Sequence, residues 1–267
     1  MSLKTKELAE IERLAKRCTH AIADILEPGM SEQDAASLMR EWLKQQGVNQ
    51  HLHRPLAWFG TRTALTGRSG WLPRPGIRPD YFPSDVSLRD GMAVSLYCAP
   101  SIEHTAAESL LCTTIGQNPD YACLVSDVAE LQTRLHDFVS QNRSIQALEE
   151  MMQRFAAGRR LQLAHRRPPV LDWLRPYSIS PDTGYADARL VDKLATLTGN
   201  PMPAHLPTSQ IPLDHSSHLS DGLWVIQPWL VRDKRGAGFR SLLHVNNGAV
   251  NWLNTDEMPL EQLMESA

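Results

Sequence analysis

The stretch Leu88-Arg89-Asp90-Gly91-Met92-Ala93-Val94 recurs 131 residues later (219 − 88) as Leu219-Ser220-Asp221-Gly222-Leu223-Trp224-Val225. A second stretch follows close behind it, because Glu108-Ser109-Leu110-Leu111 recurs 132 residues later (240 − 108) as Arg240-Ser241-Leu242-Leu243. Two nearly equal offsets in the same order favour two copies of one β unit.

Helical patterns precede each copy. One apolar stripe has the three- and four-residue spacing of a helix face, and it consists of Ile11, Ala15, Cys18, Ile22 and Ile25. A shift of 113 residues (124 − 11) gives the same stripe as Leu124, Val128, Leu131, Leu135 and Phe138. The set Ser31, Leu38, Met39 and Trp42 likewise shifts to Ser144, Met151, Met152 and Phe155. Amphipathic helices resemble one another, so a single pair would leave chance similarity open, but four segments in the same order favour duplication. The sequence predicts one domain, residues 1–267, whose halves span roughly 7–117 and 118–257, each with helix, turn, helix and strands.

Composition narrows the class of protein. A chain of 267 residues that is 42% hydrophobic can bury a substantial core. Its 27 basic and 30 acidic residues give a net charge of −3, which predicts neither a nucleic-acid partner nor an anionic membrane surface. No apolar run is long enough for a membrane span, and the N-terminus leads into an amphipathic helix. Four cysteines without CxxC spacing look like buried thiols, so a cytoplasmic location is expected.

Turn residues set the boundaries of the first helices. Pro28 and Gly29 end the first helix, and Ser31 is expected to cap the second in a capping box with Asp34. The segment from Val48 to Pro83 is rich in Gly, Pro and Arg, which predicts a long irregular binding segment. Its several aromatic rings indicate that part of it packs onto the sheet.

Three motifs carry a family resemblance. Ile25-Leu26-Glu27-Pro28-Gly29-Met30-Ser31-Glu32 resembles the helix–PGMTE–helix element of the pita-bread superfamily, which includes methionine aminopeptidase, aminopeptidase P and creatinase. Leu88–Met92 resembles the approach to the first metal-binding strand of that family, and Ile226-Gln227-Pro228 is similar to its Ile-Glu-Pro motif. The resemblance covers nearly the whole chain and implies an α/β pita-bread fold, with two pseudo-twofold-related halves around a curved antiparallel sheet.

The same resemblance implies a set of metal ligands that this sequence does not reproduce. The family holds two divalent metals with two Asp, one His and two Glu, since hard cations bridged by hydroxide require clustered carboxylates. The family's spacing places these acids at Tyr97, at Glu108, at Gln227, and at Phe239 or Arg240. The metal-binding His has no clear match, because His205 is displaced along the chain. We therefore expect neither a metal nor another cofactor.

A pocket that once balanced carboxylates with cations must be neutral in another way. We predict that Glu108 and Arg240 pair where the metals would lie, with a bidentate guanidinium fork. The alternative is that both side chains point to solvent on opposite faces.

The resulting expectation is non-catalytic binding of a small peptide or an amino-acid-like ligand. The cleft residues would be Tyr97, Glu108, Gln227, Phe239, Arg240, Trp58 and Trp71, with Phe59 as a further candidate for the wall. Arg240 would bind a carboxylate and Glu108 an amine. One alternative is a metal-independent, creatinase-like hydrolase with His205 as a weak candidate base, and another is a protein-interaction module with an exposed apolar patch. The sequence does not decide between a monomer and a homodimer.

Two histidine clusters are candidates for a catalytic or metal site. His51-Leu52-His53 would place both rings on one face of a strand, and Asp214-His215-Ser216-Ser217-His218 combines an acid, two imidazoles and two hydroxyls. Neither has HExxH or GxSxG spacing, so exposed loop histidines are the favoured interpretation.

Overall fold

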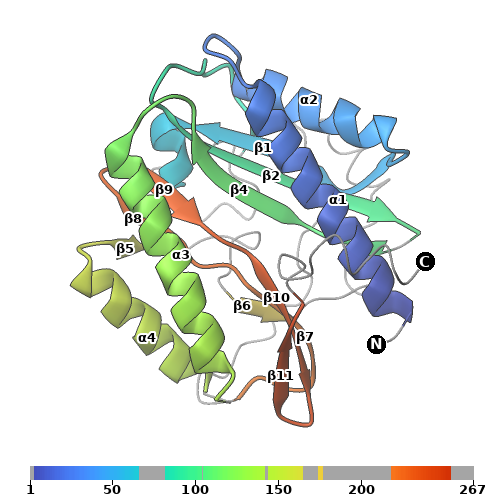
Figure 1. Cartoon of the computed structure of the whole chain (residues 1–267), viewed down its shortest axis with the longest axis vertical. Coiled ribbons are helices and arrows are strands. Elements are labelled where there is room, and N and C mark those ends of the chain that lie inside the picture. Colours follow the sequence, from blue (N-terminus) through green and yellow to red (C-terminus); the bar gives the residue numbers. More distant parts are fainter. Residues whose placement is uncertain are drawn as a thin grey trace, which may run out of the picture.

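The chain contains two successive groups of helices and strands in the same order (Figure 1). The computed structural model describes residues 3–65, 82–103, 105–141, 144–164, 174–176 and 218–253. The first group is α1 (Leu3–Ile25), α2 (Glu32–Gln45), β1 (Gln50–Phe59), the 3-10 helix η1 (Gly60–Ala64), β2 (Ala93–Ile102), β3 (Thr105–Ala106) and β4 (Ser109–Thr114). The second group is α3 (Pro119–Val139), α4 (Ile145–Gly158), β5 (Gln162–Leu163), β6 (Leu174–Pro176), β7 (Gly222–Ile226), β8 (Trp229–Arg232), β9 (Arg235–Gly238), β10 (Ser241–Asn246) and β11 (Ala249–Trp252).

Helix starts follow the sequence signals. Asp34 N donates to Ser31 Oγ at 3.1 Å and Ser31 N donates to Asp34 Oδ2 at 2.9 Å, which confirms the predicted capping box. The equivalent Ser144 caps α4, because Ala147 N donates to its Oγ at 3.2 Å.

The two N-cap serines make equivalent contacts in the two halves. Ser31 forms an isolated antiparallel bridge with Ser87, and Ser144 forms one with His218. Ser87 and His218 are the residues immediately before the repeated Leu88 and Leu219 motifs. The second helix of each half is therefore fixed to the same point of its own β unit, as expected for two copies of one fold.

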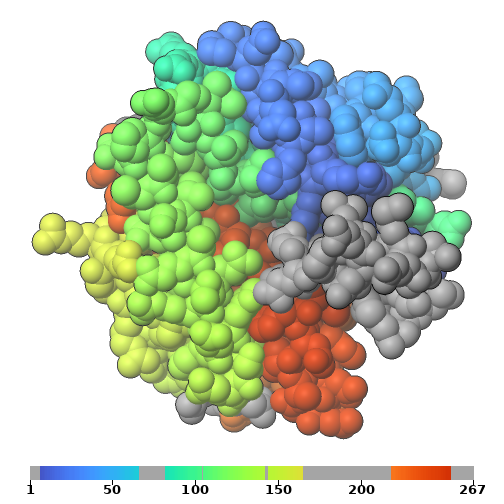
Figure 2. All heavy atoms as spheres, viewed as in Figure 1, coloured from blue at the N-terminus to red at the C-terminus, as the bar shows by residue number. Residues whose placement is uncertain are grey.

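The described strands form three antiparallel sheets. One has the order β1-β2-β3 with β4 also on β2, the second has the order β11-β10-β7-β6, and the third has the order β5-β8-β9. Residues Val94, Leu96 and Cys98 of β2 share a core with α1 and α2, and α1 crosses in front of β2 and β4 in Figure 1. Trp224 and Ile226 of β7 share a core with α3 and α4. In the space-filling view of Figure 2 the four helices make much of the face seen, with atoms of the C-terminal strands beside them.

A contact between the halves comes from the β8–β9 hairpin. Trp229 Nε1 donates to the backbone oxygen of Thr63 at 2.9 Å, and Gly236 N donates to Thr63 Oγ1 at 3.0 Å. A Cβ on Gly236 would lie 2.4 Å from the backbone oxygen of Thr63, so only glycine permits this close approach of β9 to η1.

The prediction of an irregular segment from Val48 is wrong for its first part, which is strand β1. Two register shifts, between His51 and His53 and between His53 and Leu56, let the strand accommodate Pro55. Within the described sheet β1 pairs with β2 alone, and an edge strand tolerates a residue that cannot donate a hydrogen bond. The interpretation of His51 and His53 as loop residues is wrong for the same reason, because His53 is buried in the strand and His51 is half-buried.

Cysteine burial is also only partly as predicted. Cys18 and Cys98 are buried, whereas Cys112 is half-buried and Cys123 is exposed on α3. A hydrogen bond with the Cys18 side chain and desolvation by burial raise the pKa of the Cys98 thiol well above its usual value. Within the part of the chain that is described, no helix is long and apolar enough to cross a membrane.

Candidate functional site

Tyr97 is directed away from the helices by the alternation of β2. Its neighbours Leu96 and Cys98 belong to the core under α1 and α2, so the Tyr97 side chain lies on the other face of the sheet. Leu56 lies opposite Tyr97 in the pairing of β1 with β2, and the ring of Trp58 is stacked with that of Tyr97, with centroids 6.4 Å apart. These three residues form one apolar cluster, which packs beside the polar groups described next.

A buried polar cluster consists of Tyr97, Glu108 and Arg240. The Tyr97 hydroxyl donates to Glu108 Oε2 at 2.5 Å, and Arg240 Nε donates to the same oxygen at 3.0 Å. Arg240 Nη1 also donates to the backbone oxygen of Glu108, at 2.9 Å. The side chains of Arg240 and Glu108 are only 2% and 1% exposed. We refer to these three residues as the Tyr97–Glu108–Arg240 cluster.

The cluster confirms that Glu108 and Arg240 pair, and it corrects the expected form of the contact. Of the described contacts of the guanidinium with Glu108, one is to the carboxylate oxygen Oε2 and the other is to the main-chain oxygen. This arrangement fixes both the charge and the backbone of the β3–β4 link. Because carboxylate and guanidinium neutralise one another, the cluster carries no net charge.

Gln227 lies opposite Arg240. Ile226 pairs with Ser241 and Trp229 pairs with Gly238, and the same antiparallel register extended across the gap places Gln227 against Arg240. Gln227 is 2% exposed, and within the described part of the chain neither its Oε1 nor its Nε2 has a hydrogen-bond partner. The family resemblance places this amide where the Ile-Glu-Pro motif has its acid.

The remaining predicted site residues are not all brought to the cluster. Trp58 lies beside it, fully buried, and contacts Trp229 edge to face with ring centroids 6.4 Å apart. Phe239 belongs to the apolar core of α3 and α4, so its place in a binding cleft stays a prediction. Trp71 and His205 lie outside the described residues, as do Asp214 to Ser217.

His53 is a neighbour of the cluster that the sequence did not assign to it. Its ring centroid lies 4.6 Å from that of Tyr97, and its Nδ1 lies 2.8 Å from the backbone oxygen of Arg54. The alternation in His51-Leu52-His53 was the available signal, but it became informative only once the segment proved to be a strand. Burial and the charge of His53 lower the pKa of His51 to about 4, so His51 stays neutral at physiological pH.

Glu32 forms a second buried polar centre that was also missed. Its carboxylate is 0% exposed and accepts from the backbone N of Phe59 at 2.8 Å, from Arg62 Nε at 2.9 Å, and from Ser84 N and Oγ at 2.8 and 2.7 Å. Arg62 Nη2 also donates to the backbone oxygen of Phe82 at 2.7 Å. Glu32 therefore ties together the chain on both sides of residues 66–81. In the sequence Glu32 is the first helical residue after Ser31, a position at which an acid is usually solvated, so the sequence did not indicate its burial.

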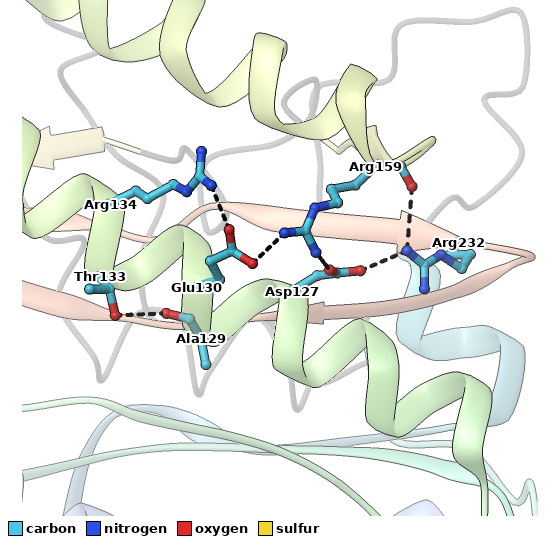
Figure 3. A network of polar contacts seen from close by, with 7 residues as sticks. All are labelled: Asp127, Ala129, Glu130, Thr133, Arg134, Arg159 and Arg232. Carbon is cyan, nitrogen blue, oxygen red and sulfur yellow. Dashed lines mark hydrogen bonds and ion pairs between the residues drawn. The ribbon is translucent and has the colours of Figure 1, made fainter.

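A third polar network joins α3, α4 and β8 and is drawn in Figure 3. Asp127 accepts from Arg159 at 2.5 Å and from Arg232 at 2.6 Å, while Glu130 accepts from Arg159 at 2.5 Å and from Arg134 at 2.7 Å. Desolvation raises the pKa of Glu130, but the hydrogen bonds and charges of Arg159 and Arg134 outweigh it and hold this pKa below its usual value. All of these acceptors already have partners, so we assign the network to packing of the helices on the sheet.

Comparison with known proteins defines the family. A model of metallopeptidase family M24 matches residues 6–171, which is more than half of the chain. The chain belongs to this family. A search of curated proteins gave no match.

Solved structures show the same fold at low sequence identity. An X-Pro aminopeptidase from Thermotoga maritima has a TM-score of 0.65 at 14% identity, with 95% of this chain and 61% of that chain covered. A prolidase from Pyrococcus furiosus has a TM-score of 0.63 at 14% identity, covering 97% and 65%. The dipeptidase PepE from Mycobacterium ulcerans has a TM-score of 0.65 at 16% identity, covering 97% and 59%. This chain thus spans about three fifths of the length of these proteins, and the similarity confirms the α/β pita-bread fold.

The side chains that the family resemblance assigns to the metal-ligand positions are a poor fit to two divalent cations. Hard cations require several carboxylate or carbonyl oxygens. Among the described residues no group of three or more His, Cys, Asp or Glu side chains is placed to hold a metal ion. In the Tyr97–Glu108–Arg240 cluster the carboxylate oxygen that faces Tyr97 already accepts two hydrogen bonds, one of them from a fixed cation.

The two alternative functions gain no support from the described residues. A creatinase-like hydrolase would depend on His205, which is outside them. An interaction module predicts an exposed apolar patch, and the exposed large apolar side chains in the described ranges are Ile25 and Ile102, at the ends of two different elements.

Proposed function

We propose that this chain is a non-catalytic member of family M24, in which the dinuclear metal centre has been replaced by the Tyr97–Glu108–Arg240 cluster. Its function is to bind a small peptide or an amino-acid-like ligand beside that cluster. The observation that carries the proposal is the buried contact between Arg240 Nε and Glu108 Oε2, at 3.0 Å.

Electrostatics oppose a metal centre at the Tyr97–Glu108–Arg240 cluster. A metal bound by Glu108 at ordinary coordination distance would lie a few ångströms from the Arg240 guanidinium. Two unit charges 4 Å apart repel by about 4 kcal/mol at an effective dielectric constant of about 20, so a divalent cation would be opposed by about 8 kcal/mol. Arg240 thus supplies the positive charge that the carboxylate needs, and it cannot polarise a carbonyl or activate a water as a metal does.

The mutual pairing also changes the expected ligand contacts. The sequence suggested that Arg240 would bind a ligand carboxylate and Glu108 a ligand amine. Since each is already engaged with the other, a ligand would have to break a buried ion pair to reach either one. We therefore assign ligand recognition to the groups beside the cluster and give the cluster itself a supporting role.

Metal binding tests the first half of the proposal. The purified protein would be incubated with Mn²⁺, Co²⁺ or Zn²⁺, desalted, and measured by elemental analysis, with release of amino acids from Xaa-Pro dipeptides followed in parallel. We expect metal well below one equivalent and no hydrolysis. Stoichiometric metal together with dipeptide hydrolysis would show that the protein is a working metallopeptidase and would overturn the proposal.

Ligand binding tests the second half. Titration calorimetry with a panel of dipeptides and free and capped amino acids is expected to give saturable binding by at least one member. An Arg40→Met protein serves as a control for substitution at the surface. Arg40 is an exposed arginine paired with an exposed glutamate, so this variant should bind as the parent does. Absence of binding across the panel would contradict the assigned role.

A further inference from the structure

Gln227 is a buried amide whose hydrogen-bonding capacity is not used. It is 2% exposed, and both its oxygen and its nitrogen lack a hydrogen-bond partner among the residues that the structure describes. Buried polar groups in native proteins nearly always have a hydrogen-bond partner, and leaving one unsatisfied is destabilising. A group that is kept in this state is therefore a candidate for contact with something that is not part of the chain.

The surroundings of Gln227 define what it could recognise. It lies opposite Arg240, whose charge is neutralised by Glu108. The next residues on the same face, Val225 and Leu242, belong to an apolar cluster that includes Leu8 of α1. The amide thus lies between a neutral polar cluster and an apolar wall, where a ligand with an uncompensated charge would be strongly disfavoured.

We propose that Gln227 recognises an uncharged ligand that carries an amide group. This inference rests on the proposed function and specifies its ligand class. A carboxamide offers an acceptor oxygen and a donor nitrogen side by side in one plane. A primary amide of the ligand presents the complementary pair, so two hydrogen bonds satisfy both groups of Gln227 at once. A carboxylate has no donor for this pairing, and it brings a charge that the site does not balance.

The low exposure of Gln227 adds a condition on access. Because the amide is closed off from solvent, the neighbouring chain has to move aside before a ligand makes these bonds. We therefore expect the bound protein to exchange its amide hydrogens more slowly than the free protein around β7 and β10.

The test compares two ligands of equal side chain in calorimetric titrations. N-acetyl-L-leucinamide carries amides and no charge, whereas L-leucine carries two charged termini. We expect the capped amide to bind the parent protein at least ten times more tightly than the free amino acid. Gln227→Leu keeps the volume and removes both polar groups, and it should weaken binding of the capped amide at least tenfold. It should also raise the midpoint of thermal unfolding of the ligand-free protein, because it removes an unsatisfied buried amide.

A second glutamine provides the matched control. Gln132 lies on α3, and its Nε2 already donates to Ser241 Oγ at 3.2 Å. Gln132→Leu should leave binding of the capped amide unchanged.

The outcomes separate this inference from the proposed function. Equal binding of the capped amide by the parent and by Gln227→Leu would overturn the inference, and so would tighter binding of L-leucine; both would leave the proposed function standing. An unchanged or lowered unfolding midpoint in Gln227→Leu together with no binding of the capped amide would show that a water satisfies Gln227, which also overturns the inference. Failure of every peptide and amino acid to bind the parent would overturn the proposed function as well.

Discussion

Removal of Arg240 is the most direct test of the Tyr97–Glu108–Arg240 cluster. Arg240→Met keeps a long apolar side chain and deletes the guanidinium. The Glu108 carboxylate, whose side chain is 1% exposed, would then retain the hydrogen bond from Tyr97 but lose the ion pair at 3.0 Å. Its main-chain oxygen would also lose the bond from Nη1 at 2.9 Å.

The expected loss is large because a buried charge is left without its counterion. Breaking such a pair from one side costs about 3–5 kcal/mol of unfolding free energy. For a protein of this size a change of 1 kcal/mol moves the unfolding midpoint by about 2–4 °C, so the Arg240→Met midpoint should fall by about 6–20 °C. Combining Arg240→Met with Glu108→Gln removes both charges and keeps an acceptor for the Tyr97 hydroxyl, so the double variant should regain most of the loss.

Urea unfolding followed by tryptophan fluorescence measures these differences, since Trp58, Trp224 and Trp229 are buried. Arg40→Met is the control, because Arg40 and Glu41 are both 54% exposed, and it should leave the unfolding free energy unchanged within error. If Arg240→Met behaves like Arg40→Met, the two charges are solvated and the reasoning about a buried counterion is refuted. Single changes that add up to the double change would refute the direct coupling.

Three further predictions concern other positions. Glu32→Gln keeps the shape of the side chain but removes its charge, and urea unfolding should show that the unfolding free energy falls by about 2–4 kcal/mol. A fall below about 0.5 kcal/mol would contradict the importance of the hydrogen bonds to the Glu32 carboxylate. Gly116→Ala should destabilise the protein by at least about 1 kcal/mol, because Gly116 has φ +74° and a Cβ would lie 1.9 Å from Asp90 Oδ1. Gly29 has φ +100° but nothing within 4 Å of an added Cβ, so Gly29→Ala should lower the unfolding free energy by less. The pKa of His51 is lowered from 6.5 to about 4 by burial, so its contribution to stability is complete above pH 6.5 and is lost as the pH falls towards 4; an NMR titration of His51 with a midpoint near 6.5 would disprove this.

The repeated motifs allowed much of the fold to be predicted. The capping box at Ser31 depends on contacts between residues three apart, so it is fully specified by local sequence. The pairing of Glu108 with Arg240 spans 132 residues, yet it was predictable because the repeat places the two at equivalent positions. Internal duplication thus turns a long-range contact into a statement about sequence offsets.

Other features depend on contacts that no local pattern specifies. Strand β1 contains Pro55 and shows unbroken burial from Pro55 to Phe59, so it lacks the alternation by which strands are recognised. Its pairing with β2 and its two register shifts are properties of the sheet. The role of Glu32 likewise depends on the return of Ser84 to the start of α2, which the sequence around Glu32 does not reveal. The division of the guanidinium donors of Arg240 follows from the path of the β3–β4 link, and this is why the expected bidentate geometry was wrong.

The duplication also explains how charge can be rebalanced where a metal centre is replaced. In a fold built from two equivalent halves, equivalent side chains directed at the shared axis meet each other, as they do across a twofold interface. Under the proposed function, a change to arginine in the second copy would place a guanidinium next to the acid of the first copy, and Arg240 and Glu108 are in contact at 3.0 Å. On that proposal, one substitution would supply both the positive charge and the hydrogen-bond donors that the carboxylate needs. Gln227 differs from this pair, because its amide is uncharged and neither its oxygen nor its nitrogen has a hydrogen-bond partner among the described residues.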